Sequence, residues 1–328
     1  MVRFTVLGSG SRGNGTIITG GRTRILVDAG FSCRELFRRM RLAGENPESL
    51  DAILITHEHQ DHVGGLAVTA RKLGIPVYFT EPTHRAWMRW LAPRRQMTYA
   101  QWLEQCRKQA AERQAEANAA EPEGEADDPE SNGDCSIDPA RSEGNVASAE
   151  KTSPSPKDDP AWLPAVEYFE AGRKFSIGDL EVFPFTTPHD AADPVGFVFE
   201  SEGVRIGYAT DLGYIAPNVK AGLQNLDLLL LESNHDLEML RDGPYPWQVK
   251  QRVLSRVGHL SNEATAEFLT RDYDGRAAWI VLAHLSENNN LPELARVAAE
   301  QALGGRSSLL LNRLLIAEQH QPLSSVDF

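Results

Sequence analysis

Cysteine is scarce in this sequence of 328 residues, and long apolar runs are missing. The three cysteines, Cys33, Cys106 and Cys135, lie far apart, so they predict neither a disulfide framework nor a thiolate metal site. This usage is typical of a reducing compartment, and we expect the protein to act in the cytoplasm. No stretch approaches the roughly 18 apolar residues of a membrane span, and the first residues enter a strand pattern at once. We therefore expect no signal peptide and no membrane partner.

Basic residues are also in the minority, but the imbalance is local. Lys and Arg number 33 against 46 Asp and Glu, which gives a net charge of −13. Residues 112–160 hold 14 acidic and 4 basic side chains, so this segment alone carries −10. The rest of the chain is nearly neutral, and the acidic total therefore does not exclude a nucleic acid partner.

The densest chemical signal is the stretch Thr56-His57-Glu58-His59-Gln60-Asp61-His62. The apolar run 51–55 before it reads as a buried strand, and residues 63–72 after it predict a helix. Side chains on the turn between the two can converge on one point. Neutral imidazole and carboxylate are the ligands that zinc and similar divalent ions prefer. The stretch therefore predicts two adjacent metal sites rather than a histidine-rich surface turn.

Apolar alternation and turn signals predict strands and helices on both sides of this stretch. Strands are expected at 4–7, 16–19, 24–28, 76–80, 178–185, 196–200, 204–211, 226–233 and 278–283, and a last one within 309–318. Helices are expected at 33–42 with Ser32 as the N-cap, at 81–91, 246–257 and 291–302, and after Ser261. His84, in the second of these helices, is expected to be a surface or packing residue. Strands that alternate with helices indicate an α/β fold.

Composition changes after Pro93. Residues 99–120 are rich in Ala, Gln, Glu and Arg and predict a polar helix, whereas residues 121–160 hold almost no large apolar side chains. The latter cannot bury enough surface to offset chain entropy, so we expect a disordered acidic insertion at 95–160 between two halves of one domain, 1–94 and 161–328. Such an insertion is tolerated in a surface loop. Replacing 121–160 by a short Gly/Ser linker should leave folding and metal content unchanged.

The motif His57-x-His59-x-Asp61-His62 resembles the signature of the metallo-β-lactamase fold superfamily. That resemblance implies an αββα sandwich that holds two divalent ions, Zn or Mn, per chain. It also implies a ligand set completed by residues that follow later apolar runs. By resemblance, one ion would be held by His57, His59 and His189, the other by Asp61, His62 and His284, and Asp211 would bridge them. The β-lactamases of the superfamily have cysteine at the bridging position, so Asp211 argues against β-lactam hydrolysis.

Longer motifs resemble the YycJ/WalJ-type metallo-hydrolases of this superfamily. They lie at 7–14, 28–30, 188–191, 210–213, 232–236, 258–262 and 282–286, and the resemblance spans 3–92 and 166–318. It implies a phosphodiesterase with 5′→3′ exonuclease activity on double-stranded DNA and a role in DNA repair. A metal-bound hydroxide would attack phosphorus, and the protein would contact the DNA backbone. Two other functions stay open, a small-molecule thioesterase of the glyoxalase II type and a metal-free scaffold.

Polar residues in these motifs are candidates for catalysis and substrate binding. The catalytic candidates are Asp61, His259, His235 and Glu232, and the substrate-binding candidates are Ser11, Arg12, Asn14, Ser261 and Asn262. We predict that His259, at a helix start, acts at the leaving group or the bound phosphate; the alternative is a histidine that only caps the turn. Asp28 could orient a ligating histidine or cap its own turn. Lys250, Arg252 and Arg256 could meet phosphate or be ordinary solvated charges.

Overall fold

The computed structural model describes residues 1–92, 107–108, 159–304 and 312–328. The chain divides into two units, residues 1–91 with 159–328, and residues 92–158. The expected polar helix at 99–120 lies outside the described residues except for 107–108, and so does the expected disorder at 121–160 except for its last two residues. Among the helices that the structure describes, none has the length and apolar character needed to cross a membrane.

The first sheet comes mainly from the N-terminal half of the chain. Within the described residues it has seven strands in the order β14-β1-β2-β3-β4-β5-β6. Their bounds are β1 Val2–Gly8, β2 Gly15–Gly20, β3 Thr23–Val27, β4 Ala52–Leu54, β5 Val77–Phe79, β6 Val166–Tyr168 and β14 Val326–Asp327. Strands β1, β2 and β3 form an antiparallel meander, and β3 to β6 are parallel. Because β6 and β14 follow the insertion in sequence, the two predicted halves share this sheet.

The second sheet is formed by the chain after the insertion. In the described residues it also has seven strands, in the order β13-β12-β11-β10-β9-β8-β7. Their bounds are β7 Phe175–Ile177, β8 Leu180–Thr186, β9 Val195–Ser201, β10 Val204–Ala209, β11 Leu228–Glu232, β12 Trp279–Ala283 and β13 Arg313–Ile316. Strands β10 to β13 are parallel, whereas β7, β8 and β9 are antiparallel to their neighbours.

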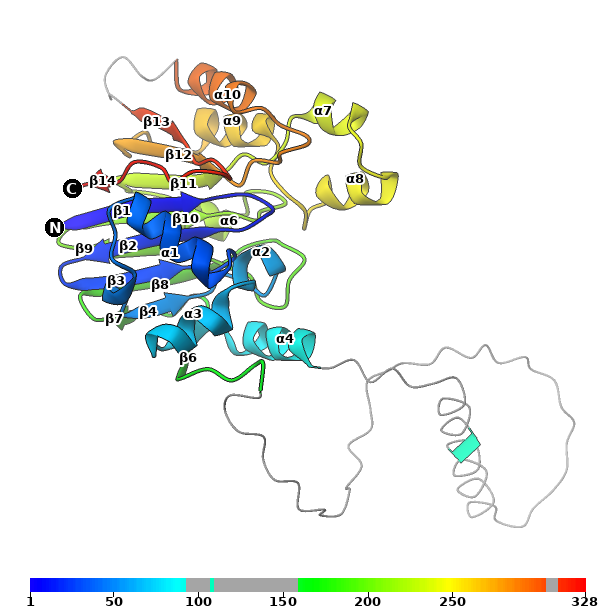
Figure 1. Cartoon of the computed structure of the whole chain (residues 1–328). Coiled ribbons are helices and arrows are strands. Elements are labelled where there is room, and N and C mark those ends of the chain that lie inside the picture. The colour runs from blue at the N-terminus through cyan, green and yellow to red at the C-terminus, as the bar shows by residue number, and fades with distance from the viewer. Residues whose placement is uncertain (93–106, 109–158, 305–311) are drawn as a thin grey trace, which may run out of the picture. The chain divides into compact units, whose positions relative to one another are not determined.

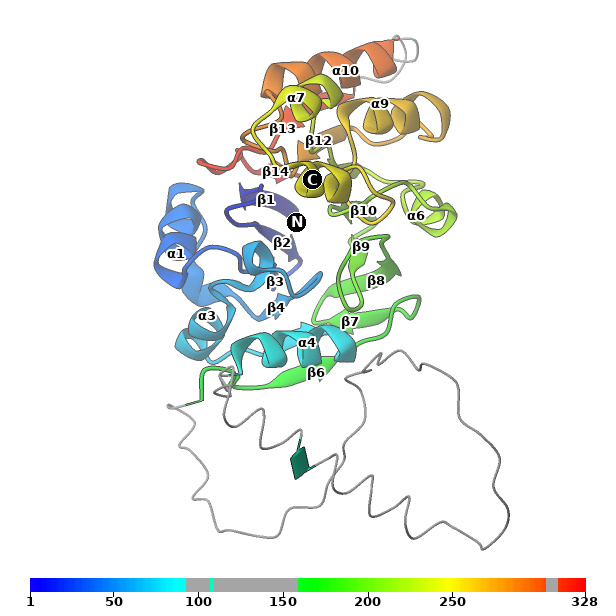
Figure 2. The ribbon, with the colours of Figure 1, turned by 90° about the vertical axis from the view of Figure 1, so that its right-hand side faces the viewer.

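Several helices lie on the outer faces of the two sheets, whereas α2, α7 and α8 lie at the strand ends (Figures 1 and 2). Their bounds are α1 Cys33–Leu42, α2 Gln60–Val63, α3 Leu66–Leu73, α4 Glu81–Leu91, α6 Pro217–Gly222, α7 Leu237–Asp242, α8 Trp247–Val253, α9 Asn262–Arg271 and α10 Pro292–Gly304, with a short 3-10 helix at Pro47–Ser49. Figure 2 shows α1 and α3 beside the first sheet, and α6 and α9 beside the second. The αββα sandwich expected from the resemblance is confirmed.

Alternation of side chains along the strands builds the core. In β11, Leu228 and Leu230 face the interior between the sheets, whereas Leu229 and Leu231 pack among the residues under α9 and α10. All are buried, as expected for a parallel strand that is covered on both faces. This explains why the run reads as continuously apolar in the sequence.

Two expectations for the elements need correction. The single helix expected after the histidine motif is divided into α2 and α3 at Gly64-Gly65. A Cβ on Gly65 would lie 1.9 Å from the carbonyl oxygen of Phe31. The loop that leads into α1 therefore approaches residue 65 so closely that only glycine fits there. In addition, β14 pairs with β1 at the edge of the first sheet, and no pattern in the last residues predicted this strand.

Candidate metal centre

The candidate site forms where strands of both sheets end. Strands β10, β11 and β12 are parallel, and β8 runs the same way because β8 and β10 both pair antiparallel with β9. In the first sheet, β3 and β4 are parallel and lead into Asp28 and the loop 55–59. Ligands commonly bind at the carboxyl ends of parallel strands. The residues found there are His189 after β8, Asp211 after β10, Glu232 at the end of β11 and His284 after β12.

Three residues at these strand ends have left-handed backbone conformations. The φ angles are 61° at Asp28, 61° at Asp211 and 57° at His284. A residue with a Cβ is disfavoured in this region by roughly 1–2 kcal/mol, and such conformations tend to gather at functional sites. The chain therefore keeps local strain at each of these turns.

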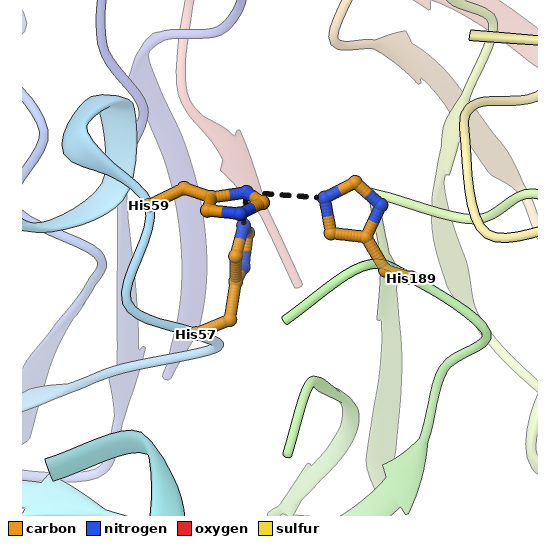
Figure 3. Close-up of side chains that lie close together, drawn as sticks. All are labelled: His57, His59 and His189. Atoms are coloured by element: carbon orange, nitrogen blue, oxygen red, sulfur yellow. Dashed lines mark hydrogen bonds between the residues drawn. The ribbon is translucent and has the colours of Figure 1, made fainter. Parts of the chain in front are cut away.

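Three histidines form the first cluster, which Figure 3 shows with the side chains pointing toward one another. Nδ1 of His59 lies 3.1 Å from Nε2 of His57 and 3.2 Å from Nε2 of His189. His57 and His59 come from the loop between β4 and α2, and His189 comes from the loop after β8. Three imidazole nitrogens in such a small space suit a cation, because at most one N–H can be shared among them.

A second cluster combines Asp61, His62 and His284. Oδ2 of Asp61 lies 3.4 Å from Nε2 of His62 and 3.3 Å from Nε2 of His284. Atoms of these three residues lie within 4.8 Å of one another, close enough to hold one ion. A further group of donors, His57, His62 and Asp211, takes one histidine from each cluster, so the two clusters adjoin each other.

Asp211 lies between the two clusters. Its Oδ1 is 3.8 Å from Nε2 of His189, and its Oδ2 is 3.4 Å from Nε2 of His62. Oδ2 is buried and has no hydrogen-bond partner. A buried carboxylate oxygen without a donor is costly unless a cation is present, so this atom fits a bridging metal ligand.

Hydrogen bonds fix which ring nitrogen of each histidine faces the centre. Nδ1 of His62 lies 2.8 Å from Oδ2 of Asp28, Nδ1 of His189 lies 3.1 Å from the carbonyl oxygen of Gly258, and Nδ1 of His57 lies 2.9 Å from Oγ1 of Thr56. The carboxylate of Asp28 and the carbonyl of Gly258 can only accept, and the hydroxyl of Thr56 gives its own hydrogen to Asp28, so these Nδ1 atoms carry the proton. Nε2 is then left with a lone pair, which is the arrangement that metal-binding histidines require.

Glu232 supports the site and has no capacity left for an ion. Its Oε1 accepts from Nδ1 of His259 at 2.8 Å and from Nδ1 of His284 at 2.9 Å, and its Oε2 accepts from the backbone N–H groups of Leu212 and Leu260. Burial favours the neutral acid, but the charge and hydrogen bond of His259 and the hydrogen bond of His284 hold the pKa of Glu232 at about 2. Since a carboxylate has about four acceptor positions, Glu232 orients His259 and His284.

Burial favours the neutral form of two histidines in the first cluster, His57 and His59. Burial is the main cause that lowers the pKa of His57 well below its ordinary value, and the neighbouring His62 adds to it. Burial and the nearby His189 likewise lower the pKa of His59. Burial alone would raise the pKa of Asp61, but the charges of His62 and His284 lower it well below the usual range. Neutral imidazoles and an ionised carboxylate are the forms that bind a divalent ion.

A cavity of about 200 Å³ opens next to the second cluster. Asp61, His259 and His284 line it, together with Ser11 and Arg252. Nδ1 of His259 is held by Glu232, which directs the other ring nitrogen away from that carboxylate. Arg252 is ion-paired with Asp190. Of the Lys and Arg side chains that the structure describes, it is the one that lines this cavity.

The substrate-binding candidates fall into different places. Ser11 lines the cavity, and Arg12 is exposed and paired with Glu287 at 2.7 Å. Asn14 is buried, and its Nδ2 lies 3.2 Å from Oδ2 of Asp61 and 3.1 Å from Nε2 of His62. Asn14 therefore positions a proposed ligand instead of facing a substrate.

Ser261 and Asn262, the other substrate-binding candidates, lie at the start of α9 and make structural contacts. Ser261 caps α9 by accepting from the N–H of Ala264 at 3.1 Å. Asn262 is buried and accepts from Oγ of Ser233 at 2.7 Å, while its Nδ2 donates to Asn290 at 2.9 Å. Both side chains are committed to holding α9 and its neighbouring loops.

His235, a catalytic candidate, is buried, and neither of its ring nitrogens has a hydrogen-bond partner. Burial lowers its pKa from 6.5 to about 4. It does not line the cavity. His84 packs in the interior against Phe79 and Trp87, which confirms the packing alternative for that residue.

Sequence reasoning missed several contacts around the centre. Thr56 donates its hydroxyl to Asp28, and Asp28 also accepts from the N–H of Thr56 at 2.9 Å. Asp190 and Tyr245 line the cavity, although neither was a candidate. The sequence signal for Asp190 was its position next to His189. No feature of the sequence indicated that Tyr245 lies at the site.

Comparisons with known proteins agree with this architecture. A family model described as the metallo-β-lactamase superfamily matches residues 8–284. The chain is 32% identical to exodeoxyribonuclease WalJ of Streptococcus pneumoniae over 90% of this chain and 86% of that protein. It is 31% identical to exodeoxyribonuclease YycJ of Bacillus anthracis over 92% of this chain and 89% of that protein. The chain therefore belongs to the metallo-β-lactamase superfamily and, within it, to the YycJ/WalJ-type metallo-hydrolases.

The fold is shared with more distant proteins. The metallo-β-lactamase fold protein YhfI from Bacillus subtilis superimposes with a TM-score of 0.59 over 98% of each chain, at 14% sequence identity. An identity this low shows the fold alone. Together with the family membership, the histidine and aspartate clusters make this chain a metal-dependent hydrolase.

Proposed function

We propose that this protein is a two-metal phosphodiesterase that removes nucleotides from the end of a double-stranded DNA. The observation that carries this proposal is the position of Asp211, whose oxygens lie near histidines of both clusters. An aspartate between two sites suits the paired ions that stabilise both the attacking and the leaving oxygen of a phosphate ester. Relatives named exodeoxyribonuclease, at 31–32% identity, support a DNA substrate.

Two divalent ions, Zn or Mn, would polarise the phosphoryl oxygens and lower the pKa of an attacking water. One would be held by His57, His59 and His189, the other by Asp61, His62 and His284, with Asp211 shared. The remaining chemistry falls to the side chains. Nδ1 of His259 donates to Glu232, so a proton for the leaving oxygen would come from Nε2 of the imidazolium form; burial opposes that form, but the charge and hydrogen bond of Glu232 raise the pKa of His259. Ser11 and Arg252 line the cavity and would contact the phosphate.

Electrostatics outside the insertion are compatible with DNA. Of the total charge of −13, only −3 belongs to residues outside 112–160. Of the three cations considered in the sequence, Arg252 alone lines the cavity. Lys250 donates to the carbonyl oxygen of Arg241 at 2.7 Å, and Arg256 stacks over the ring of Tyr214 at 4.3 Å. We therefore propose contacts to the DNA backbone rather than readout of base sequence, and action in the cytoplasm.

The proposal is tested with end-labelled duplex DNA and protein loaded with Mn²⁺ or Zn²⁺. We expect release of labelled nucleotides, no β-lactam turnover, and loss of activity in His59→Ala. Cleavage of a thioester such as a glutathione ester, with no release from DNA under either metal, would contradict the proposal and favour the thioesterase. Arg89→Ala serves as the surface control, because Arg89 is exposed and lies far from these clusters in the sequence.

A further inference from the structure

The segment 237–257 forms one side of the cavity, and its second helix is exposed. It contains α7 and α8, which project beyond the strand ends in Figure 1. No residue of α8 is buried. Val249 is 40% exposed although it lines the cavity next to the metal clusters. An apolar side chain that is exposed to solvent beside a polar site is a candidate for contact with a bound ligand.

The cavity lining has two chemically different parts. Asp61, His259 and His284 supply the polar part. Tyr245, Val249 and Val253 supply an apolar part, and Arg252 lies among them in sequence. In α8, Val249 is followed three and four residues later by Arg252 and Val253, so all three lie on one face of the helix. A ligand would thus meet aromatic and aliphatic surface within reach of both a cation and the metal ligands.

Tyr245 is held in place before any ligand arrives. It lies between Pro244 and Pro246, which restrict the backbone on both sides. Its hydroxyl is also 3.4 Å from Nδ2 of Asn288, a residue from the loop before α10. A ring fixed in this way loses little conformational freedom when a planar group packs against it.

The size of the cavity limits the group that can enter. At about 200 Å³ it is smaller than the roughly 300–1,000 Å³ of pockets for drug-sized ligands. It can hold one ring system and a phosphate, but not a base pair with its backbone. Enzymes that do chemistry on a base take it out of the stack, and proteins that bind single strands pack bases against aromatic side chains.

We propose that Tyr245, Val249 and Val253 receive the base of the terminal nucleotide of a DNA strand, while Arg252 exchanges Asp190 for the phosphate of that nucleotide. This inference rests on the proposed nuclease function and deepens it. It explains why the enzyme acts at a DNA end, because only a terminal base that has separated from its partner strand can enter the pocket. Arg252 is 60% exposed and its partner Asp190 is 27% exposed, so a phosphate can compete for the guanidinium.

The test compares two duplexes, one with ordinary ends and one with an abasic nucleotide at each terminus. We expect the metal-loaded wild type to degrade the ordinary duplex about tenfold faster at subsaturating concentration, the usual worth of stacking one base on an aromatic ring. Tyr245→Ala should bring that ratio close to one, and Val249→Ser should reduce it. Fraying of the abasic end is common to all variants and cancels when their ratios are compared.

Trp247→Ala is the matched control. Trp247 begins α8 and is 64% exposed, but it does not line the cavity, so its loss should keep the tenfold ratio. A wild type that degrades both duplexes equally, or a ratio that Tyr245→Ala and Val249→Ser leave unchanged, would overturn the base pocket while the nuclease stands. A wild type that degrades neither duplex would overturn the proposed function and this inference with it.

Discussion

One carboxylate oxygen of Glu232 lies 2.9 Å from Nδ1 of His284 and thereby determines which nitrogen of that histidine faces Asp61. Glu232 ends β11 and His284 follows the parallel strand β12, so the pairing of these strands places the two side chains together. The ligand role proposed for His284 thus depends on a residue outside the proposed ligand sets.

Glu232→Gln tests this dependence. All the oxygen positions of Glu232 accept from N–H groups, so the amide nitrogen of Gln faces donors in either orientation. We expect metal affinity to fall roughly 10- to 100-fold, as for other groups that orient ligands, which a chelator competition would measure. Glu267→Gln, at an exposed position on α9, should have no effect. Metal affinity equal to the wild type in Glu232→Gln would show that His284 does not need this partner.

Asp28→Asn addresses the same metal position through its other histidine, His62. Asn tolerates the left-handed backbone of residue 28, so the substitution removes charge without adding backbone strain. Its amide would donate to Nδ1 of His62, which moves the ring proton to Nε2 and removes the lone pair that faces Asp61. We expect one of two ions to be lost first in a metal titration, with a drop in affinity of about 10- to 100-fold. Two ions bound as tightly as in the wild type would refute this assignment, and Asp51→Asn is the control.

Gly30→Ala should destabilise the fold around the site. A Cβ on Gly30 would lie 1.6 Å from the carbonyl oxygen of Asp61 and 2.6 Å from the backbone nitrogen of Asn14. Because these are backbone atoms, the loops must separate, and we expect a loss of about 3 kcal/mol in the free energy of unfolding in denaturant. Gly304→Ala has no atom within 4 Å of the new Cβ and should be nearly neutral. Equal stability of the two variants would show that the loops do not need this contact.

His235 gives the folded state a pH dependence. Its pKa is about 4 in the fold because of burial, against 6.5 ordinarily, so the unfolded chain binds its proton first as pH falls. The contribution of neutral His235 to the free energy of unfolding is therefore fully present above pH 6.5. It decreases by roughly 2–3 kcal/mol as the pH falls to about 4. The charges that face His235 are those of Glu232, His259 and Asp236.

The variant His235→Phe keeps a planar ring without a titrating group. Its unfolding free energy should fall less than that of the wild type between pH 6.5 and 4, as measured in denaturant. His320→Phe, at a position where the side chain is 70% exposed, should retain the wild-type slope. Identical slopes for wild type and His235→Phe would contradict the assignment.

The sequence brings out the proposed ligands because they follow recognisable elements. His57 and His59 come after a strong strand run, and the other candidates lie just beyond apolar runs that become β8, β10 and β12. Parallel strands then bring their ends together without any further signal from the residues between them. Local rules also give the α/β class and helix starts such as those after Ser32 and Ser261, whereas the sandwich was expected from the resemblance to the superfamily.

The contacts that tune the site could not be predicted in this way. Thr56 and Asp28 are 28 residues apart and Glu232 and His284 are 52 apart, so their hydrogen bonds depend on which strands pair. Ser261 and Asn262 look like exposed polar residues at a helix start, yet the helix packs them inward. Tyr245 lies in a short turn whose course is set by the prolines and by the distant Asn288.

The most direct test of the account is a metal titration followed by release of nucleotide from an end-labelled duplex. Metal-free protein receives zero, one or two equivalents of Mn²⁺ per chain, and the first turnover is measured at each point. We expect little release up to one equivalent and a steep rise with the second, because Asp211 and both ligand clusters act together. Full activity with a single equivalent, or none with two bound ions, would contradict a two-metal DNA hydrolase.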